Sequence, residues 1–96
     1  MELQFEYVNI PRNNYFEYLV EEKLNPLAKK FPIVISANVF FKIENKTDEC
    51  DNICEIKLDT QESSIYVVAH EASIEQAIQK TYNAIENKLI NSNDNN

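Results

Sequence analysis

The side chains of this sequence that could do catalytic chemistry are few. Cys50 and Cys54 stand four positions apart, and His70 is the only histidine. Two thiols and one imidazole fall one ligand short of the set of four that a structural zinc site needs, and no nucleophile stands at a recognisable spacing from the imidazole. We therefore predict Cys54 in the core, Cys50 in a loop without a disulfide, and His70 as a solvated or hydrogen-bonded residue at a strand end. The sequence thus indicates no enzyme, metal or cofactor.

The acidic segment 44–51 raises the question of a calcium site. Its carboxylates are Glu44, Asp48, Glu49 and Asp51. Their spacing lacks the EF-hand pattern and its glycine, so a solvated acidic loop is the better interpretation. The sequon Asn45-Lys46-Thr47 matches a glycosylation acceptor, but the acidic, alternating start of the chain does not resemble a secretion signal. We interpret the sequon as a chance match and expect a cytoplasmic protein.

Composition and charge exclude several further classes of protein. The chain has 96 residues, 44% of them hydrophobic, which is enough for one small soluble domain and too few for two. It contains no glycine, which excludes glycine-rich phosphate loops and the G-x-S-x-G nucleophile elbow. No apolar run approaches the ~18–20 residues of a membrane span. The net charge is −7, and such a chain is repelled by nucleic acid and anionic lipid unless its cations gather on one face.

The hydrophobic pattern predicts six secondary-structure elements. Apolar residues alternate with polar ones in four segments and recur at three- and four-residue spacing in two others. The predicted strands are 3–7, 33–43, 54–59 and 65–70, and the predicted helices are 15–30, capped by Asn13 or Asn14, and a second one capped by Ser73. In this β-α-β-β-β-α order the first two strands are parallel and the last three form an antiparallel meander. We predict an α+β two-layer sandwich, in which two helices pack on one face of a four-stranded mixed sheet.

Two boundaries within this pattern carry specific expectations. Pro26 inside the first helix predicts a kink or an early stop near Glu22–Asn25, because proline lacks the backbone donor that a helix interior needs. Residues 1–90 are predicted to form a single domain. Residues 91–96 are all polar and have nothing to bury, so we predict a disordered tail there.

The sheet face away from the helices is expected to be open to solvent. Its predicted residues are Val34, Phe40, Lys42, Lys57, Tyr66 and Val68, with Glu6, Glu55 and Asp59 among them. Aromatic residues beside cations on an open sheet can stack single-stranded bases. An apolar strip such as Phe40 with Val68 can equally support a weak homodimer, and bare exposure of the sheet is the third alternative.

The sequence also resembles a known family across residues 3 to 90. The segments that carry the resemblance are Tyr18–Leu24, Leu27–Phe31, Ile35–Glu44, Cys54–Leu58, Ala77-Ile78 and Lys88-Leu89. They are similar, in register, to the ribosome hibernation promoting factors and ribosome-associated translation inhibitors, also called sigma-54 modulation proteins. No single segment is specific, but the run of matches is.

The resemblance implies a double-stranded-RNA-binding-domain-like sandwich that binds the small ribosomal subunit in the channel used by messenger RNA and transfer RNA. Members of the family block initiation and preserve idle ribosomes during starvation. They hold ribosomal RNA phosphates with basic side chains of their helices and catalyse nothing. Carried onto this chain, the rRNA-binding residues are Lys23, Lys29, Lys30, Lys42 and Lys88. The implied partners are 16S rRNA and ribosomal proteins, with no membrane and no small-molecule substrate.

The sequence departs from the family at several basic positions. Glu22 and Pro26 stand where lysine is usual, and Lys88 is the one cation where the last helix normally ends in a dense basic run. A second hypothesis is therefore a divergent acidic paralogue, which binds a basic protein partner such as a ribosomal protein and does not bind rRNA. A third is an enzyme or a small-molecule binder on the same fold.

Overall fold

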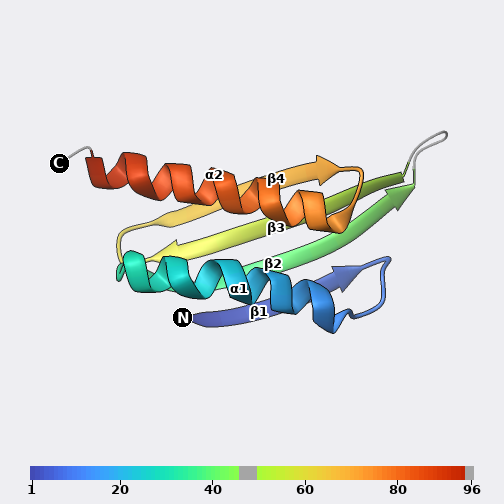
Figure 1. The fold of residues 1–96 in the computed structure, drawn as a ribbon, viewed down its shortest axis with the longest axis horizontal. Helices are drawn as coiled ribbons and strands as arrows, with labels where there is room; N and C mark the ends of the chain where they lie inside the picture. The colour runs from blue at the N-terminus through green and yellow to red at the C-terminus, as the bar shows by residue number, and fades with distance from the viewer. Residues whose placement is uncertain (46–49, 95–96) are drawn as a thin grey trace.

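The computed structural model describes residues 1–45 and 50–94, and the side chains of all but Cys50, Asn93 and Asp94 among them. Its elements are β1 (Glu2–Val8), α1 (Asn14–Lys30), β2 (Val34–Asn45), β3 (Cys50–Thr60), β4 (Ser64–Glu71) and α2 (Ile74–Asp94). The strands lie in the order β1-β2-β3-β4, with β1 parallel to β2 and the other pairs antiparallel. Both helices cover one face of the sheet (Figure 1). The predicted α+β sandwich is confirmed.

Helix α1 is continuous from Asn14 to Lys30. The side chain of Asn13 caps it, accepting hydrogen bonds from the backbone N–H groups of Tyr15 at 2.9 Å and Phe16 at 3.4 Å. The predicted early stop is wrong, because the helix passes through Pro26. Pro26 and Glu22 are both exposed, so water can reach the Glu22 carbonyl that proline leaves without a donor.

Helix α2 begins after Ser73, whose hydroxyl accepts the backbone N–H of Gln76 at 3.1 Å, and continues to Asp94. The polar tail predicted from residue 91 therefore starts inside the helix, which is a correction at that boundary. Nothing in the sequence stops the helix at residue 90, since no glycine or proline follows. Residues 95–96 of the predicted tail lie outside the described part of the chain.

The strands depart from the predicted pattern at two places. The register shifts between Val34 and Ser36, and this bulge leaves Val34 only 8% exposed while Ile35 is 51% exposed. The prediction that Val34 faces solvent is thus wrong. At the other end, β2 and β3 extend into the predicted acidic loop and pair Glu44 with Asp51. The remaining acids of that loop, Asp48 and Glu49, lie outside the described residues.

The core lies between the sheet and the two helices. Phe41 is fully buried and its ring lies 6.1 Å from that of Phe5, 5.2 Å from that of Tyr7 and 5.7 Å from that of Phe16, so β1, β2 and α1 share one aromatic cluster. Cys54 is buried as a free thiol, as predicted, and burial raises its pKa to about 12. The same core includes Ile78, Ile85 and Leu89 of α2, so it holds both helices in place with their outer surfaces facing solvent.

Candidate nucleic-acid interface

The outer surface of α1 and α2, which we call the helical layer, is the first candidate site. The two helices lie side by side with their C-terminal ends at the same end of the sheet (Figure 1). Lys30 from α1 and Leu89 from α2 line one pocket of about 180 Å³ at that end. The end of α1 is therefore adjacent to the end of α2, which also carries Lys88.

Lys23 lies at the seam between the helices. Its ammonium donates to Oε1 of Gln79 at 2.6 Å and lies 5.3 Å from the ring centroid of Tyr82. Both partners come from α2, so Lys23 connects the two helices. A cation held by an amide and an aromatic face keeps its charge but has less freedom to reach outward for a phosphate.

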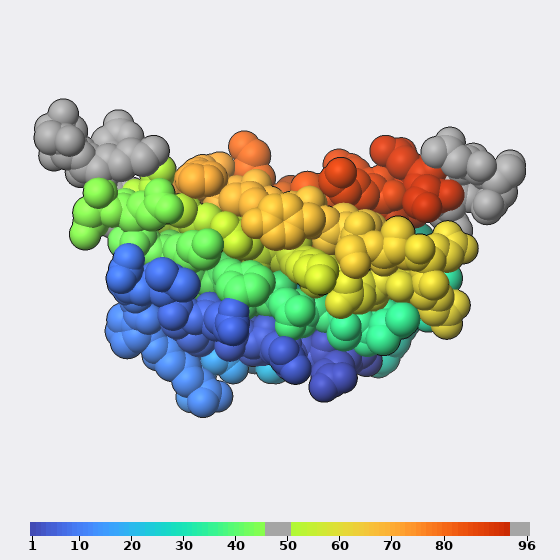
Figure 2. Space-filling model, turned by 180° about the vertical axis from the view of Figure 1, so that it is seen from behind, coloured from blue at the N-terminus to red at the C-terminus, as the bar shows by residue number. Residues whose placement is uncertain are grey.

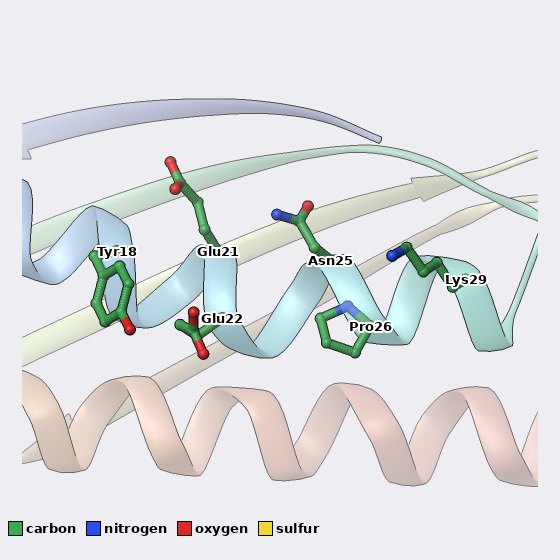
Figure 3. A pocket seen from close by; sticks show the side chains of 6 residues that line it. All are labelled: Tyr18, Glu21, Glu22, Asn25, Pro26 and Lys29. Atoms are coloured by element: carbon green, nitrogen blue, oxygen red, sulfur yellow. The ribbon is translucent and has the colours of Figure 1, made fainter.

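Lys29 and Lys30 are exposed in the last turn of α1, where positive charge complements the helix dipole. The Lys30 ammonium lies 5.6 Å from the ring centroid of Phe31. Lys29 lines a surface depression of about 320 Å³ with Glu21, Glu22 and Asn25. Figure 3 shows Glu21 and Asn25 pointing away from α2, with Glu22 on the side of α1 nearer to it.

Carboxylates and aromatic rings share this surface with the lysines. Tyr15 and Tyr18 are each 54% exposed, one helical turn apart, and exposed tyrosines can stack on unpaired bases. The carboxylate of Glu22 raises the pKa of Tyr18. The charges of α1 sum to zero, so its attraction for RNA depends on the local position of Lys29 and Lys30 and not on a net positive field.

Helix α2 contributes fewer cations, and they lie apart. Lys88 is exposed and stands six residues after Tyr82, which is ~120° around the helix axis, so it lies on a different flank from the seam with α1. Lys80 was not among the candidate site residues predicted from the sequence. It is exposed and pairs with Glu71 of β4, with 3.6 Å between Nζ and Oε2. Only its place on the polar side of α2 could have pointed to it.

The exposed surface of α2 carries a row of amide side chains. Gln76, Gln79, Asn83 and Asn87 recur at helical spacing and line a depression of about 440 Å³. The Gln79 amide donates to Oδ1 of Asn83 at 2.9 Å. Amide side chains can contact phosphate oxygens and sugars without a charge. The sequence showed these residues as polar helix positions but gave no signal that they form one surface.

Lys42 lies on the other side of the molecule from the helical layer. It projects from β2 onto the open sheet face, where its ammonium lies 3.0 Å from Oε1 of Glu55. The hydrogen bond to Glu55 raises the pKa of Lys42. The structure thus brings Lys23, Lys29 and Lys30 onto one helix, with Lys88 on its neighbour, and separates Lys42 from all four.

The residues considered first for catalysis have ordinary structural places. His70 is half exposed at the end of β4, and its Nδ1 lies 3.4 Å from Oδ2 of Asp51. No group of three or more histidine, cysteine or acidic side chains that could hold a metal occurs among the described residues. In that same part of the chain, no helix has the length and apolarity needed to cross a membrane.

The fold therefore defines a small α+β sandwich with a lysine-bearing helical layer on one side and an uncovered sheet on the other. A ribosomal subunit interface protein from Coxiella burnetii has a similar structure, with a TM-score of 0.84, 16% identity and coverage of 97% of this chain and 98% of that one. The N-terminal domain of Protein Y from Thermus thermophilus is also similar, with a TM-score of 0.79, 20% identity and coverage of 93% and 96%.

The sequence comparison gives the family. Residues 3–95 match the family described as sigma 54 modulation protein / S30EA ribosomal protein. The chain belongs to this family, which consists of ribosome-associated proteins that are not enzymes. No curated protein matches the chain. The predicted family resemblance is confirmed.

Proposed function

We propose that this protein binds the small ribosomal subunit in the cytoplasm through its helical layer and holds the subunit out of translation, as a hibernation factor. Family membership supports the ribosome as partner, and so does the similarity to a protein described as a ribosomal subunit interface protein. The observation that carries the proposal is the position of Lys29 and Lys30, which are exposed together at the end of α1. The proposed interaction between lysines and rRNA phosphates is electrostatic and involves no catalysed reaction.

The lysines divide into three roles under this proposal. Lys29, Lys30 and Lys88 are exposed, form no ion pair with another described residue, and contact rRNA phosphates under this proposal. Lys23 orients α1 against α2 through Gln79 and Tyr82, and adds charge to the centre of the layer. Lys42 can reach RNA only by giving up its ion pair with Glu55, and we assign it the smallest contribution.

Co-sedimentation with purified small subunits tests the proposal. The wild-type chain is expected to pellet with subunits at low ionic strength and to be released as salt rises, because each neutralised phosphate releases counterions. Lys29→Glu and Lys30→Glu should each weaken binding. Lys57→Glu is the matched control, since it makes the same change in net charge at an exposed residue of the sheet.

The outcomes separate the two main hypotheses. Absence of binding at low ionic strength would overturn the ribosome proposal and leave the acidic paralogue without rRNA binding. Equal weakening by Lys29→Glu and Lys57→Glu would show that net charge, and not the helical layer, governs the interaction. Adding the protein to a translation extract then tests whether it inhibits translation, and the Lys29→Glu variant is expected to inhibit less than the wild type.

A further inference from the structure

The sheet face opposite the helices carries an organised surface that the proposed function does not use. Figure 2 shows this face, and no helix crosses in front of its strands. Strand register aligns its outward side chains in rows across the sheet, and one row reads Glu6, Phe40, Glu55 and Val68. The adjacent row contains Val8, Lys42, Ile53 and His70. We call this surface the open face.

Apolar side chains are accessible near the centre of the open face. Tyr66 is 57% exposed and Val68 41%, and Glu55 of β3 lies between Val68 and the half-buried Phe40 in the row. Ile53 projects outward, because the neighbouring Cys54 points into the core. It is nevertheless only 2% exposed and lies outside the main core cluster. Neighbouring side chains on the open face, among them Lys42 and His70, therefore cover Ile53. We call the apolar surface of Phe40, Tyr66 and Val68, which stays accessible beside it, the apolar platform.

Carboxylates lie around the platform and, at Glu55, between its side chains. The outward acids are Glu2, Glu6, Glu44, Asp51, Glu55 and Asp59. Among the described residues, Lys42 and Lys57 are the lysines on this face, and Lys42 is already paired with Glu55. Asp59 accepts a hydrogen bond from the Ser64 hydroxyl at 2.6 Å, which orients its charge without neutralising it. The described residues of the open face therefore include more carboxylates than lysines.

The charge decides what this face can bind. A second copy of the chain would bring the same carboxylates against each other, and nucleic acid or anionic lipid would be repelled in the same way. A segment rich in lysine and arginine matches both parts of the face. Its charged groups meet the carboxylates, while the aliphatic stems of its side chains cover apolar surface and its cations can lie over the ring of Tyr66.

We propose that the open face is a docking surface for a lysine- and arginine-rich segment of another protein. This goes beyond the ribosome proposal, because the surface lies on the opposite side of the molecule from Lys29 and Lys30 and does not need them. The two faces can be occupied at the same time. The strength of the contact comes from the apolar platform, and its selectivity for cations comes from the carboxylates.

Titration of the isotope-labelled full chain with a synthetic peptide of alternating arginine and serine tests this proposal without ribosomes. Amide shifts are expected to change along the outward positions of β2, β3 and β4, around Phe40 and Val68. The double variant Glu6→Gln with Glu44→Gln should weaken binding about three- to tenfold, from two surface charge pairs. Glu21→Gln with Glu75→Gln removes the same charge from the helices and should change binding less than about twofold.

Other outcomes of the peptide titration would overturn the docking proposal. Shift changes spread over both faces, or equal weakening by the two double variants, would overturn the proposal, because net charge alone would then attract the peptide. Concentration-dependent dimerisation through Val68 or a larger response to single-stranded RNA at the same amides would also overturn it, by giving the face another occupant. Val68→Ser tests the platform, since its effect should persist at a salt concentration that removes the effect of the glutamate variants.

Discussion

The dependence of ribosome binding on salt is the prediction that tests the geometry of the helical layer most directly. Three lysines of this layer, Lys29, Lys30 and Lys88, are exposed with no carboxylate partner among the described ion pairs. Each phosphate that a lysine neutralises contributes about −0.7 to −0.9 to the slope of log K against log salt. Three contacts give a slope of about −2.1 to −2.7, so affinity should fall about 20- to 40-fold between ~50 and ~200 mM salt.

The assay is a series of co-sedimentation or anisotropy titrations with small subunits over that range of salt. Lys29→Gln should lower the magnitude of the slope by about one. Lys57→Gln, on the sheet, should leave it unchanged. A slope steeper than about −5 would refute the reasoning, because it would require more phosphate contacts than the helical layer has free lysines. A slope unaffected by Lys29→Gln would refute the assignment of that residue.

Three further predictions concern the fold that positions the lysines. Phe41→Ala should cost about 3–5 kcal/mol in the free energy of unfolding, because its ring is fully buried against three others. Urea denaturation measures this cost. An equal cost for Phe40→Ala on the open face would contradict the prediction. Because burial raises the pKa of Cys54 to about 12, its thiol should resist alkylation at neutral pH in the native state and react in urea, as site-resolved mass spectrometry can show; equal rates in the two states would refute this. The pKa values of Tyr7 and Tyr82 are raised mainly by burial, and also by hydrogen bonds to Glu17 and Glu86, so the folded state holds these protons more tightly than the unfolded one. The contribution of these two tyrosines to stability should therefore be constant below about pH 10 and be lost as the pH rises above it. A fall in the urea midpoint above about pH 10 that is equally large in the Tyr7→Phe and Tyr82→Phe double variant would contradict this.

The sequence was sufficient for the architecture because its pattern is local. Alternation in the strands, helical spacing around Leu24 and Ile85, and the caps at Asn13 and Ser73 each concern residues within a few positions of one another. The bulge that buries Val34 was not predictable in this way. It depends on the register between β2 and β3, and period-two reasoning assumes that no such shift occurs.

The candidate site could be predicted only where it lies on one element. Lys29 and Lys30 share the last turn of α1, so the sequence places them together. The partners of other lysines come from distant elements: Lys23 meets Gln79 of α2, and Lys80 meets Glu71 of β4. Lys42 was grouped with the helix lysines from family resemblance, although alternation along β2 puts it on the open face, where Glu55 holds it.

The net charge of −7 is a poor guide to what each side of this molecule binds. The Cα atoms span 18 Å along the shortest axis, which runs through the helices and the sheet (Figure 1). That distance is more than twice the Debye length of about 8 Å at physiological ionic strength. The carboxylates of the open face are therefore largely screened from a phosphate beside Lys29, and each side interacts mainly through its own charges. An acidic chain can hold RNA on one side for this reason, where exposed lysines such as Lys29 and Lys30 share one helical turn, even though Glu21 and Glu22 lie on the same side.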